Sequence, residues 1–407
     1  MLKTYTLPVA IPLLFATAAL PLRAQNTVQD SILHDGLTRQ YQLHLPPAYN
    51  GTDSLPLVVM LHGGSGSAQT VQGFTQFNPV ANNNGFMILY PEGYAPTGIG
   101  GFSWADGRGT TADQQGIDDV DFVHTLLDSL ELSYAIDTMR IYLAGFSNGG
   151  FLVQRIACER NEGFAVMGSL GCTQSVALND TCNPGRPIPT ITVHGTADSA
   201  VPYFGGIMPS SGTDVIAAMD LVEFWKGVNG CSSTLDSLNV PNTDTTDNSI
   251  VRLYDYTDCD CNADVRHLRC IGAGHTWPGV EIPALEVTAG ETNEDIVASA
   301  QLWNFFNQYS LCDTLLTHRP TAPAQQRTRL QLFPNPTTGE LHFRRPTGWQ
   351  GPLQVTVYDA NGRRVLSQGL DAGRNLQHLQ LQHLPKGMYV LRLQGGTQQA
   401  QERFLLR

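Results

Sequence analysis

Ser147 stands in a short pattern that is typical of a serine nucleophile. Residues 145–149 read Gly-Phe-Ser-Asn-Gly, which has the form Gly-x-Ser-x-Gly. In such a segment a strand turns sharply into a helix, and small residues flank the serine because the tight turn leaves no room for side chains. The pattern alone is weak, so it predicts a nucleophile only between a strand and a helix. The apolar run at 141–144 and the helical pattern from 151 to 157 meet that condition.

Asp198 is the predicted acid that completes such a nucleophile. A serine hydroxyl attacks well only when a base takes its proton and an acid orients that base. Asp198 follows the apolar run 191–193, at the carboxyl end of a predicted strand, where open α/β sheets build their sites. The alternative for Asp198 is a turn-forming residue without a chemical role.

Two histidines follow Asp198 before residue 313, and His275 is the predicted base. His267 lies in the strand-like run 265–269, whereas His275 lies in the glycine-rich loop 272–279. A loop histidine is better able to reach both a nucleophile and an acid. The chain order serine, aspartate, histidine also agrees with one known order of such triads.

Backbone N–H groups are the predicted donors for an oxyanion. One is expected from the residue after the nucleophile, Asn148, and the other from a loop after an earlier strand. The loop 61–66 reads Leu-His-Gly-Gly-Ser-Gly and follows the apolar run 57–61, so Gly64 or Ser65 is the second candidate. A phosphate-binding loop is a poorer interpretation, because no lysine follows and no complete Gly-x-Gly-x-x-Gly is present.

Three aromatic residues are candidates for a substrate pocket. Trp104, Tyr203 and Trp277 lie in predicted loops near the proposed site in the sequence. Large aromatic side chains would shape a pocket for the acyl or alcohol part of a substrate. Core packing is an equally good explanation for each of them.

Other ionisable residues near these motifs are predicted to be structural. His62 and His194 are expected to brace their loops by hydrogen bonds. Asp118, Asp119 and Asp121 begin a predicted helix, where carboxylates favour the positive end of the helix dipole. No metal ion or cofactor is expected.

Strand-like and helical patterns alternate through the first three quarters of the chain. Strands are predicted at 37–47, 57–61, 86–90, 140–144 and 191–193, and helices at 120–130, 215–225 and 296–306. This alternation predicts an α/β domain around a mostly parallel sheet flanked by helices.

The N-terminus and the cysteines predict export. Residues 7–22 form an apolar stretch after Lys3, and three prolines interrupt it, so a signal peptide at 1–24 is favoured over a membrane anchor and no transmembrane segment is expected. Eight cysteines, all within residues 158–312, predict disulfides. Their connectivity is not predictable, and the spacing Cys-x-Cys at 259–261 does not match a zinc site.

The last quarter of the chain differs in charge and pattern. Of the 407 residues, 1–312 carry a net charge of -19 and 313–407 carry +7. The Pro- and Gln-rich residues 313–328 predict a linker between a domain at 25–312 and a second one at 329–407. Alternating apolar residues and turns predict that the second domain is a small all-β sandwich. The acidic balance, without a run of Lys or Arg, argues against a nucleic-acid partner.

Residues 35–312 resemble the secreted poly(3-hydroxybutyrate) depolymerases and feruloyl esterases, which are similar to family-one carbohydrate esterases and have the α/β-hydrolase fold. The resemblance rests on the motifs at 61–64, 90–93, 118–120, 145–150, 194–198, 201–203, 229–231 and 274–279. It implies that the triad falls on Ser147, Asp198 and His275. The cysteines at 259–261 and Cys270 exceed the single cysteine that the family pattern leads us to expect there.

Residues 329–407 resemble the C-terminal sorting domain of the type IX secretion system. The similarity lies in the segments 333–339, 357–365 and 384–391 and in the basic terminal strand. It implies that the secretion machinery is a partner and that the tail is removed or used for attachment at the cell surface. The competing interpretation is a polymer-binding module, which few aromatic residues support.

Together these motifs predict an extracellular serine carboxylesterase that forms an acyl-enzyme on an ester substrate, either polymeric or small. A poly(3-hydroxybutyrate) depolymerase is the first expectation, and a feruloyl or acetylxylan esterase is the alternative. A non-catalytic surface protein that retains the fold for binding is the second alternative. No long apolar lid is visible between residues 147 and 275, which disfavours a long-chain lipase.

Overall fold

A computed structural model describes two compact units of the chain, which separate between residues 313 and 314. The described residues are 26–96, 100–232, 236–281, 289–311, 330, 332–334, 337–344, 349, 351–359, 364–370, 376–395 and 398–407. The signal peptide predicted at 1–24, the linker predicted at 313–328 and Cys312 lie outside them.

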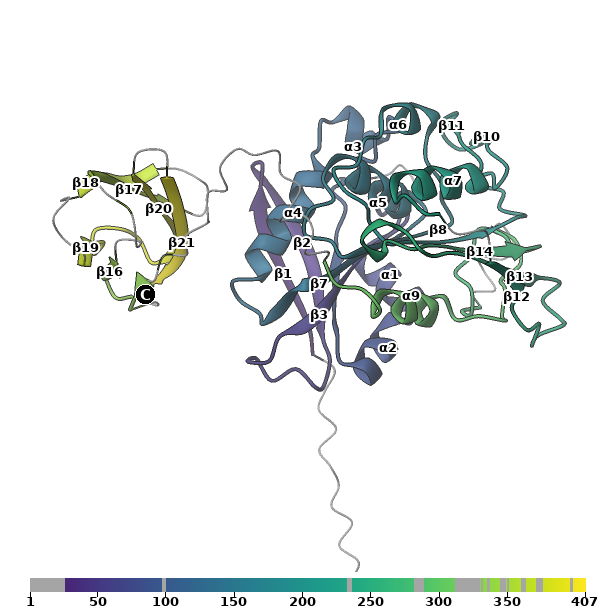
Figure 1. Ribbon diagram of the computed structural model, residues 1–407, viewed down its shortest axis with the longest axis horizontal. Helices are drawn as coiled ribbons and strands as arrows, with labels where there is room; N and C mark the ends of the chain where they lie inside the picture. Colours follow the sequence, from purple (N-terminus) through teal and green to yellow (C-terminus); the bar gives the residue numbers. More distant parts are fainter. Residues whose placement is uncertain are drawn as a thin grey trace, which may run out of the picture. The chain divides into compact units, whose positions relative to one another are not determined.

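A mixed ten-stranded sheet forms the centre of the first unit (Figure 1). Its strand order is β1-β2-β4-β3-β7-β8-β9-β14-β13-β12, and the six strands from β4 to β14 are mutually parallel. The parallel strands are β4 (Met87–Pro91), β3 (Leu55–Leu61), β7 (Ile136–Phe146), β8 (Val166–Leu170), β9 (Thr190–Gly195) and β14 (Val265–Ile271). Antiparallel pairs extend both edges through β1 (Asn26–His34), β2 (Leu37–Leu45), β13 (Ile250–Tyr256) and β12 (Asp236–Asn239).

Helices cover both faces of this sheet (Figure 1), which confirms the predicted α/β fold. One face carries α4 (Asp119–Leu130), α5 (Asn148–Glu159) and α7 (Ala218–Val228), and the other carries α1 (Ala68–Thr75), α2 (Phe77–Asn84) and α9 (Ala298–Phe306). Successive side chains of β3 alternate between the two cores, because side chains of a strand point to opposite faces. Its continuous apolar run therefore reflects burial on both sides. None of the described helices is long and apolar enough to cross a membrane.

Short elements connect the main ones. They are β5 (Ala95–Pro96), β6 (Phe102–Ser103), α3 (Thr111–Gln114), α6 (Val176–Thr181), β10 (Gly206–Ile207), β11 (Asp214–Val215) and a 3-10 turn (Asp260–Asn262).

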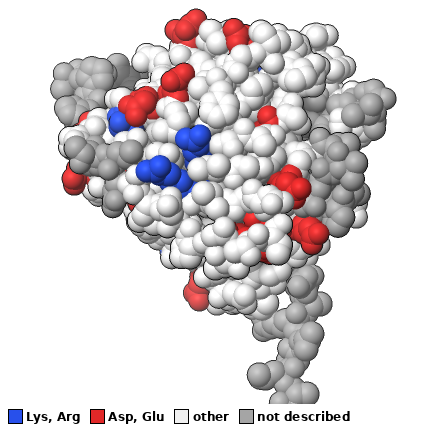
Figure 2. All heavy atoms as spheres, turned by 90° about the vertical axis from the view of Figure 1, so that its right-hand side faces the viewer, with Lys and Arg blue, Asp and Glu red and all other residues white. Residues whose placement is uncertain are grey.

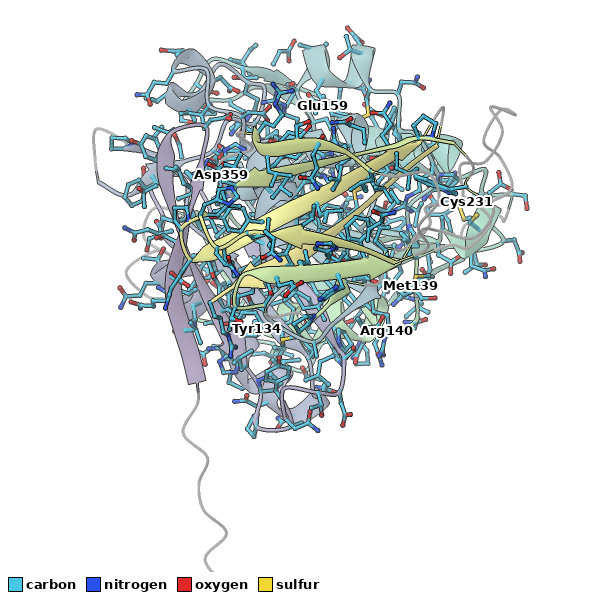
Figure 3. The ribbon with its side chains drawn as sticks, turned by 90° about the vertical axis from the view of Figure 1, so that its left-hand side faces the viewer. Tyr134, Met139, Arg140, Glu159, Cys231 and Asp359 are labelled. Atoms are coloured by element: carbon cyan, nitrogen blue, oxygen red, sulfur yellow. A yellow bond between two sulfur atoms is a disulfide. The ribbon has the colours of Figure 1, made fainter. Side chains whose placement is uncertain are left out.

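β7 begins earlier than its apolar run predicts. It starts at the buried Ile136, and the next three residues, 137–139, are half-buried or exposed. Met139 is 37 % exposed, and the guanidinium of Arg140 forms an ion pair of 2.7 Å with Asp137 (Figure 3). Polar residues at the exposed start of a strand give no apolar signal, so only the buried part, 140–144, was predictable.

Disulfides are present, as predicted. The structure pairs Cys158 with Cys182 and Cys231 with Cys259, and Cys261 is disulfide-bonded as well. Cys172 and Cys270 are free and buried. Although the number of cysteines is even, these two do not form disulfides.

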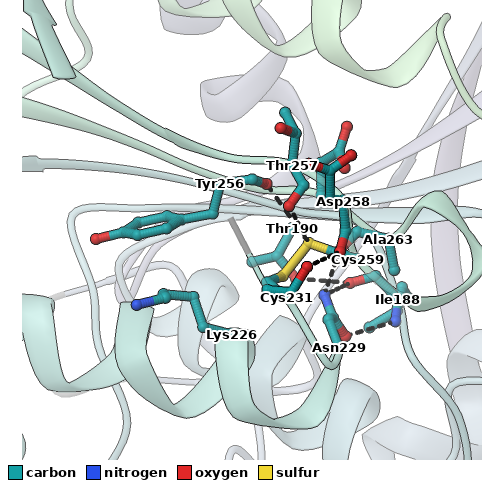
Figure 4. The surroundings of a disulfide bond; sticks show 12 residues. Ile188, Thr190, Lys226, Asn229, Cys231, Tyr256, Thr257, Asp258, Cys259 and Ala263 are labelled. Atoms are coloured by element: carbon teal, nitrogen blue, oxygen red, sulfur yellow. Dashed lines mark hydrogen bonds between the residues drawn. A yellow bond between two sulfur atoms is a disulfide. The ribbon is translucent and has the colours of Figure 1, made fainter. Parts of the chain in front are cut away.

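A buried asparagine stabilises the surroundings of the Cys231–Cys259 disulfide (Figure 4). The Asn229 amide nitrogen donates to the carbonyl oxygens of Ile188 and Ala263, both at 2.8 Å, and its oxygen accepts from the Ile188 N–H at 3.0 Å. These bonds join the segment before β9 to the segment before β14. The sheet is thereby fixed at the ends of the strands opposite to Asp198.

The second unit consists of two antiparallel sheets, which confirms the predicted all-β tail. One contains β15 (Leu332–Phe333), β16 (Glu340–Arg344) and β19 (Leu376–Gln380), and the other contains β18 (Arg364–Leu370), β17 (Leu353–Asp359), β20 (Gly387–Gly395) and β21 (Gln398–Leu406). Apolar side chains from both sheets share one core, for example Leu341 of β16 and Val357 of β17.

Charged groups are sparse on the face of the molecule in Figure 2. Most of the surface in this view is uncharged, and the few Lys and Arg lie among scattered Asp and Glu. This picture agrees with the low charge density of the sequence, in which only 15 % of residues are charged.

Candidate active site

Ser147 occupies the sharp turn between β7 and α5. Its backbone angles are φ 53° and ψ -120°, and its N–H donates to the Leu170 carbonyl at 2.9 Å. A positive φ is uncommon for a residue with a side chain, and such strain persists only where the surroundings impose it. The strand, turn and helix that the Gly-x-Ser-x-Gly pattern requires are therefore all present.

The two glycines of the pattern are needed because backbone atoms crowd the turn. A Cβ on Gly145 would lie 2.4 Å from the Gly149 oxygen. A Cβ on Gly149 would lie 2.5 Å from the carbonyl oxygens of Leu61 and His62. Neither backbone can retreat without disturbing β3 or the turn itself.

We expect Gly149→Ala to destabilise the fold by about 3 kcal/mol or more, because the new methyl group clashes with two backbone carbonyls. Gly73→Ala is the matched control, since Gly73 lies in α1 and an added Cβ there meets nothing within 4 Å. Helix propensity predicts that this control gains about 1 kcal/mol. Urea unfolding of both variants measures the difference, and equal stabilities would contradict the close packing of the turn.

The structure brings together the three residues predicted as nucleophile, base and acid. His275 Nε2 lies 2.9 Å from the Ser147 hydroxyl oxygen, and His275 Nδ1 lies 2.7 Å from Asp198 Oδ2. An ionised Asp198 has no proton to donate and can only accept, so Nδ1 donates and Nε2 is left to accept from the serine O–H. Ser147, Asp198 and His275 follow β7, β9 and β14, whose carboxyl ends meet at one edge of the sheet.

Asp198 is held as a carboxylate by several donors. Its side chain is buried, yet Oδ1 accepts from the N–H groups of Ala200 and Val201 at 2.8 and 2.7 Å. Burial raises the pKa of Asp198, but hydrogen bonds from His194 and His275 outweigh it and hold the pKa well below its usual value. The acid therefore remains charged at neutral and mildly acidic pH.

Asn148 is the first residue of α5 and is fixed by its side chain. The backbone N–H of the first residue of a helix has no hydrogen-bond partner within the helix. The Asn148 N–H is therefore free of bonds within α5 and points out of its N-terminal end. The Asn148 side chain accepts from the Trp104 N–H at 2.8 Å and donates to Asp106 at 2.5 Å. Arg108 in turn forms an ion pair of 2.6 Å with Asp106.

The loop after β3 lies against this turn. A Cβ on Gly63 would lie 3.3 Å from the Ser147 Cβ, and one on Gly64 would lie 3.6 Å from the Asn148 Cβ. Ser65 has a positive φ of 59°. Of the predicted oxyanion donors, Gly64 thus lies beside Asn148, the residue after the nucleophile, and Ser65 follows in the same loop, which lines a cleft with His275.

An apolar cleft of about 260 Å³ opens beside His275 and this loop. Three aromatic rings of Phe74, Phe146 and Trp277 form its wall, with ring centroids 5.5 to 6.0 Å apart. The sequence indicated Trp277 but missed Phe74 and Phe146. Phe146 could have been found, since it precedes the nucleophile, whereas Phe74 lies on a helix with no signal of function.

Trp104 and Tyr203 do not line this cleft, so for them the structure favours core packing, the alternative that the sequence left open, over a pocket role. Trp104 has no exposed area and donates its indole N–H to the His62 carbonyl at 2.8 Å. Tyr203 is 2 % exposed, and its hydroxyl lies 2.9 Å from His267 Nε2. Both are core residues, because loops near a site in sequence can still direct their side chains inward.

The three aspartates at the start of α4 have the structural roles predicted. Asp118 caps the helix by accepting from the Asp121 N–H at 2.9 Å. Asp119 is fully buried, pairs with Arg39 at 2.5 Å and accepts from the Ala105 N–H at 2.7 Å. Asp119 thereby holds the loop that contacts Asn148.

His62 is a brace of the loop after β3, as predicted. Its Nδ1 donates to the Gly63 carbonyl at 2.7 Å, and its Nε2 accepts from the Gly93 N–H at 2.9 Å. Burial lowers the pKa of His62 to about 4. Burial also lowers the pKa of His267 to about 3, and this residue of β14 contacts the Thr192 hydroxyl of β9 at 2.8 Å.

These two buried histidines predict a loss of stability in mild acid. An unfolded histidine has a pKa of about 6.5, so between pH 6.5 and 4 the unfolded chain binds more protons and stability falls with pH. Each histidine contributes about 3 kcal/mol to that loss. Urea unfolding at pH 7, 5.5 and 4 measures it, and His267→Leu should show a shallower pH dependence. A pH-independent stability in this range would show that the imidazoles are not buried as described.

Comparisons with known proteins cover both units. Residues 39–181 match the family model described as esterase PHB depolymerase, and residues 331–407 match the secretion system C-terminal sorting domain. NocK from Nocardia uniformis subsp. tsuyamanensis, assigned as an esterase, is 27 % identical over 68 % of this chain and 81 % of its own length.

Two further similarities involve esterases. The bifunctional acetylxylan esterase/xylanase XynS20E from Neocallimastix patriciarum is 27 % identical over 63 % of this chain. This chain spans only about a third of that relative, 34 % of its length. Among solved structures, an acetyl xylan esterase from Aspergillus awamori is 14 % identical, with a TM-score of 0.46 over 69 % of this chain and 99 % of that one.

Proposed function

This chain joins an esterase domain of the PHB depolymerase family to a secretion system C-terminal sorting domain, and we propose that it is an exported serine carboxylesterase that works through Ser147, His275 and Asp198. The observation that carries the proposal is the continuous hydrogen-bonded chain from the Ser147 hydroxyl through His275 to the Asp198 carboxylate.

In the proposed reaction, His275 Nε2 takes the hydroxyl proton while Ser147 Oγ attacks the ester carbonyl. Asn148 and either Gly64 or Ser65 donate N–H groups to the oxyanion. Asp198 keeps the imidazole in the required tautomer and stabilises its charged form. His275 then gives its proton to the leaving alcohol, and a water molecule, activated by the same histidine, releases the acyl group from Ser147.

The apolar cleft favours a substrate with an apolar unit beside the scissile ester. Phe74, Phe146 and Trp277 offer aromatic surface and no charge to that unit. A hydroxyalkanoate unit of a polyester fits this chemistry, and so does a feruloyl group. The family model supports a depolymerase, whereas the fungal relatives support the alternative of a feruloyl or acetylxylan esterase.

The place of action follows from the tail. The sorting domain implies delivery outside the cell or to its surface by the type IX machinery, after export by a signal peptide at 1–24. In this proposal the second unit is an address that is removed or used for attachment. It takes no part in hydrolysis.

Labelling with a fluorophosphonate probe tests whether the protein is an enzyme. We expect covalent labelling at Ser147 and none in Ser147→Ala. Folded protein that does not react would favour the alternative of a non-catalytic binding protein.

Product release then separates the substrate classes. Amorphous poly(3-hydroxybutyrate), methyl ferulate and acetylated xylan are incubated with the enzyme, with Ser147→Ala as the blank. Release of hydroxybutyrate alone would establish a depolymerase. Release of ferulate or acetate without attack on the polyester would establish a polysaccharide esterase.

A further inference from the structure

We propose that His194 is a positioning residue of the triad, a second imidazole that fixes the Asp198 carboxylate for His275. The inference rests on the proposed function, and it goes beyond the loop-bracing role that the sequence predicts for His194. His194 Nε2 lies 3.2 Å from Asp198 Oδ2, the same oxygen that contacts His275 Nδ1 at 2.7 Å.

All acceptor positions of the Asp198 carboxylate are occupied. Each carboxylate oxygen has two lone pairs. Oδ1 accepts from the N–H groups of Ala200 and Val201, and Oδ2 accepts from His194 and His275. Four donors therefore fix both the plane and the direction of this group, and His194 is the donor that orients Oδ2 independently of His275.

The surroundings of His194 determine its tautomer. Nε2 lies between two acceptors, Asp198 Oδ2 and the Val201 carbonyl at 3.0 Å, so it carries a proton. Nδ1 is buried and has no hydrogen-bond partner among the described residues. A proton on Nδ1 would be a buried donor without an acceptor, which is costly. The single Nε2 proton is thus shared between the Val201 carbonyl and Asp198 Oδ2, and His194 can act toward Asp198 only as a donor.

The core holds the His194 ring in place. His194 is 2 % exposed, and its ring packs edge-on against Tyr203 at a centroid distance of 5.3 Å. The Tyr203 hydroxyl contacts His267 Nε2 at 2.9 Å, and His267 Nδ1 contacts the Thr192 hydroxyl at 2.8 Å. This network gives Tyr203 a role that its sequence position did not suggest, because it supports the acid rather than a substrate.

The consequence concerns the charged intermediate state of His275. When the imidazole takes the Ser147 proton, its positive charge needs an acceptor at a fixed position. Without His194, only His275 itself would orient Oδ2. The carboxylate could then tilt when His275 moves. Such a misorientation lowers kcat more than it weakens the binding of the substrate.

Three variants of His194 test the proposal. Leucine has a similar size and no donor, glutamine carries an amide nitrogen near the position of Nε2, and asparagine is polar but too short to reach Oδ2. We expect His194→Leu and His194→Asn to lower kcat about tenfold or more, as the loss of a hydrogen bond to a charged group predicts, with KM changed less than about twofold. His194→Gln should recover most of the activity.

His44→Leu is the matched control. It removes an equally buried imidazole, on β2, that contacts Thr27 and Asn82 and lies outside the network around His194. We expect it to lose stability and to keep kcat within about threefold. Unfolding curves and titration of active sites with a fluorophosphonate ensure that rates refer to folded enzyme. If the leucine variant does not fold, the asparagine and glutamine variants still give the comparison.

Two results would overturn the positioning role. One is a wild-type kcat in both His194→Leu and His194→Asn. The other is an equal loss of kcat in His194→Gln, His194→Asn and His44→Leu, which would indicate a general effect of the core. Failure of the proposed function has a different signature, since the unmodified protein would then hydrolyse no ester above its Ser147→Ala blank.

Discussion

Ser147→Ala is expected to lower kcat about 10⁶-fold, because the proposed acyl-enzyme forms on the Ser147 hydroxyl, which contacts His275 Nε2 at 2.9 Å. The change removes one oxygen atom, and the Ser147 N–H can still donate to the Leu170 carbonyl. Secondary structure and unfolding free energy should therefore stay close to those of the wild type. A small residual rate is expected, since the backbone donors for the oxyanion remain.

Hydrolysis of a chromogenic short-chain ester measures this effect. Ser133→Ala is a suitable control, since Ser133 is exposed in the turn before β7. It should keep full activity. More than about 1 % of the wild-type kcat in Ser147→Ala, with the wild-type contamination excluded by mass spectrometry, would show that another residue is the nucleophile.

Asp198→Asn is expected to lower kcat about 10⁴-fold through the wrong tautomer of His275. The N–H groups of Ala200 and Val201 donate to the Oδ1 position, so the amide oxygen of asparagine must take that place. The amide NH₂ then faces His275 Nδ1 as a donor. Nδ1 becomes the acceptor, the ring proton moves to Nε2, and His275 can no longer accept the proton of Ser147.

The expected signature of Asp198→Asn is a loss of kcat at neutral pH with partial recovery at high pH, where the serine hydroxyl ionises more readily. Asp220→Asn, an exposed change at the start of α7, is the control and should be neutral. A variant with a flat, wild-type pH profile and full activity would exclude Asp198 as the acid.

Spacing and local pattern predicted the parts of the site that depend on the backbone. The turn at Ser147 needs a glycine on each side, and Asp198 and His275 must follow the carboxyl ends of strands. Both requirements leave a pattern in the sequence, so these three positions could be predicted. The direction of a side chain is set by packing, which a single sequence does not reveal. That is why the sequence could not decide between a pocket and a core position for Trp104 and Tyr203, which are buried in the core.

In the fold too, some strands leave a clear pattern in the sequence and others do not. Strands buried on both faces, such as β3, give continuous apolar runs and were predicted closely. The edge strands β1 and β12 have mostly polar or half-buried side chains and gave no clear run. The contact between His194 and Asp198 was also beyond prediction, because it depends on the exact course of the chain after β9.

The distance along the chain between the reacting groups has a consequence for biosynthesis. Ser147 and His275 are 128 residues apart, and the parallel pairings from β7 through β8 and β9 to β14 separate them in the sheet. Contacts of such high contact order form late in folding. A nascent chain that lacks β14 therefore has its serine but no base, and it remains inert toward the esters of the cell that makes it. In the proposed mechanism, hydrolytic activity therefore begins only after the pairing of β14 has brought His275 to Ser147.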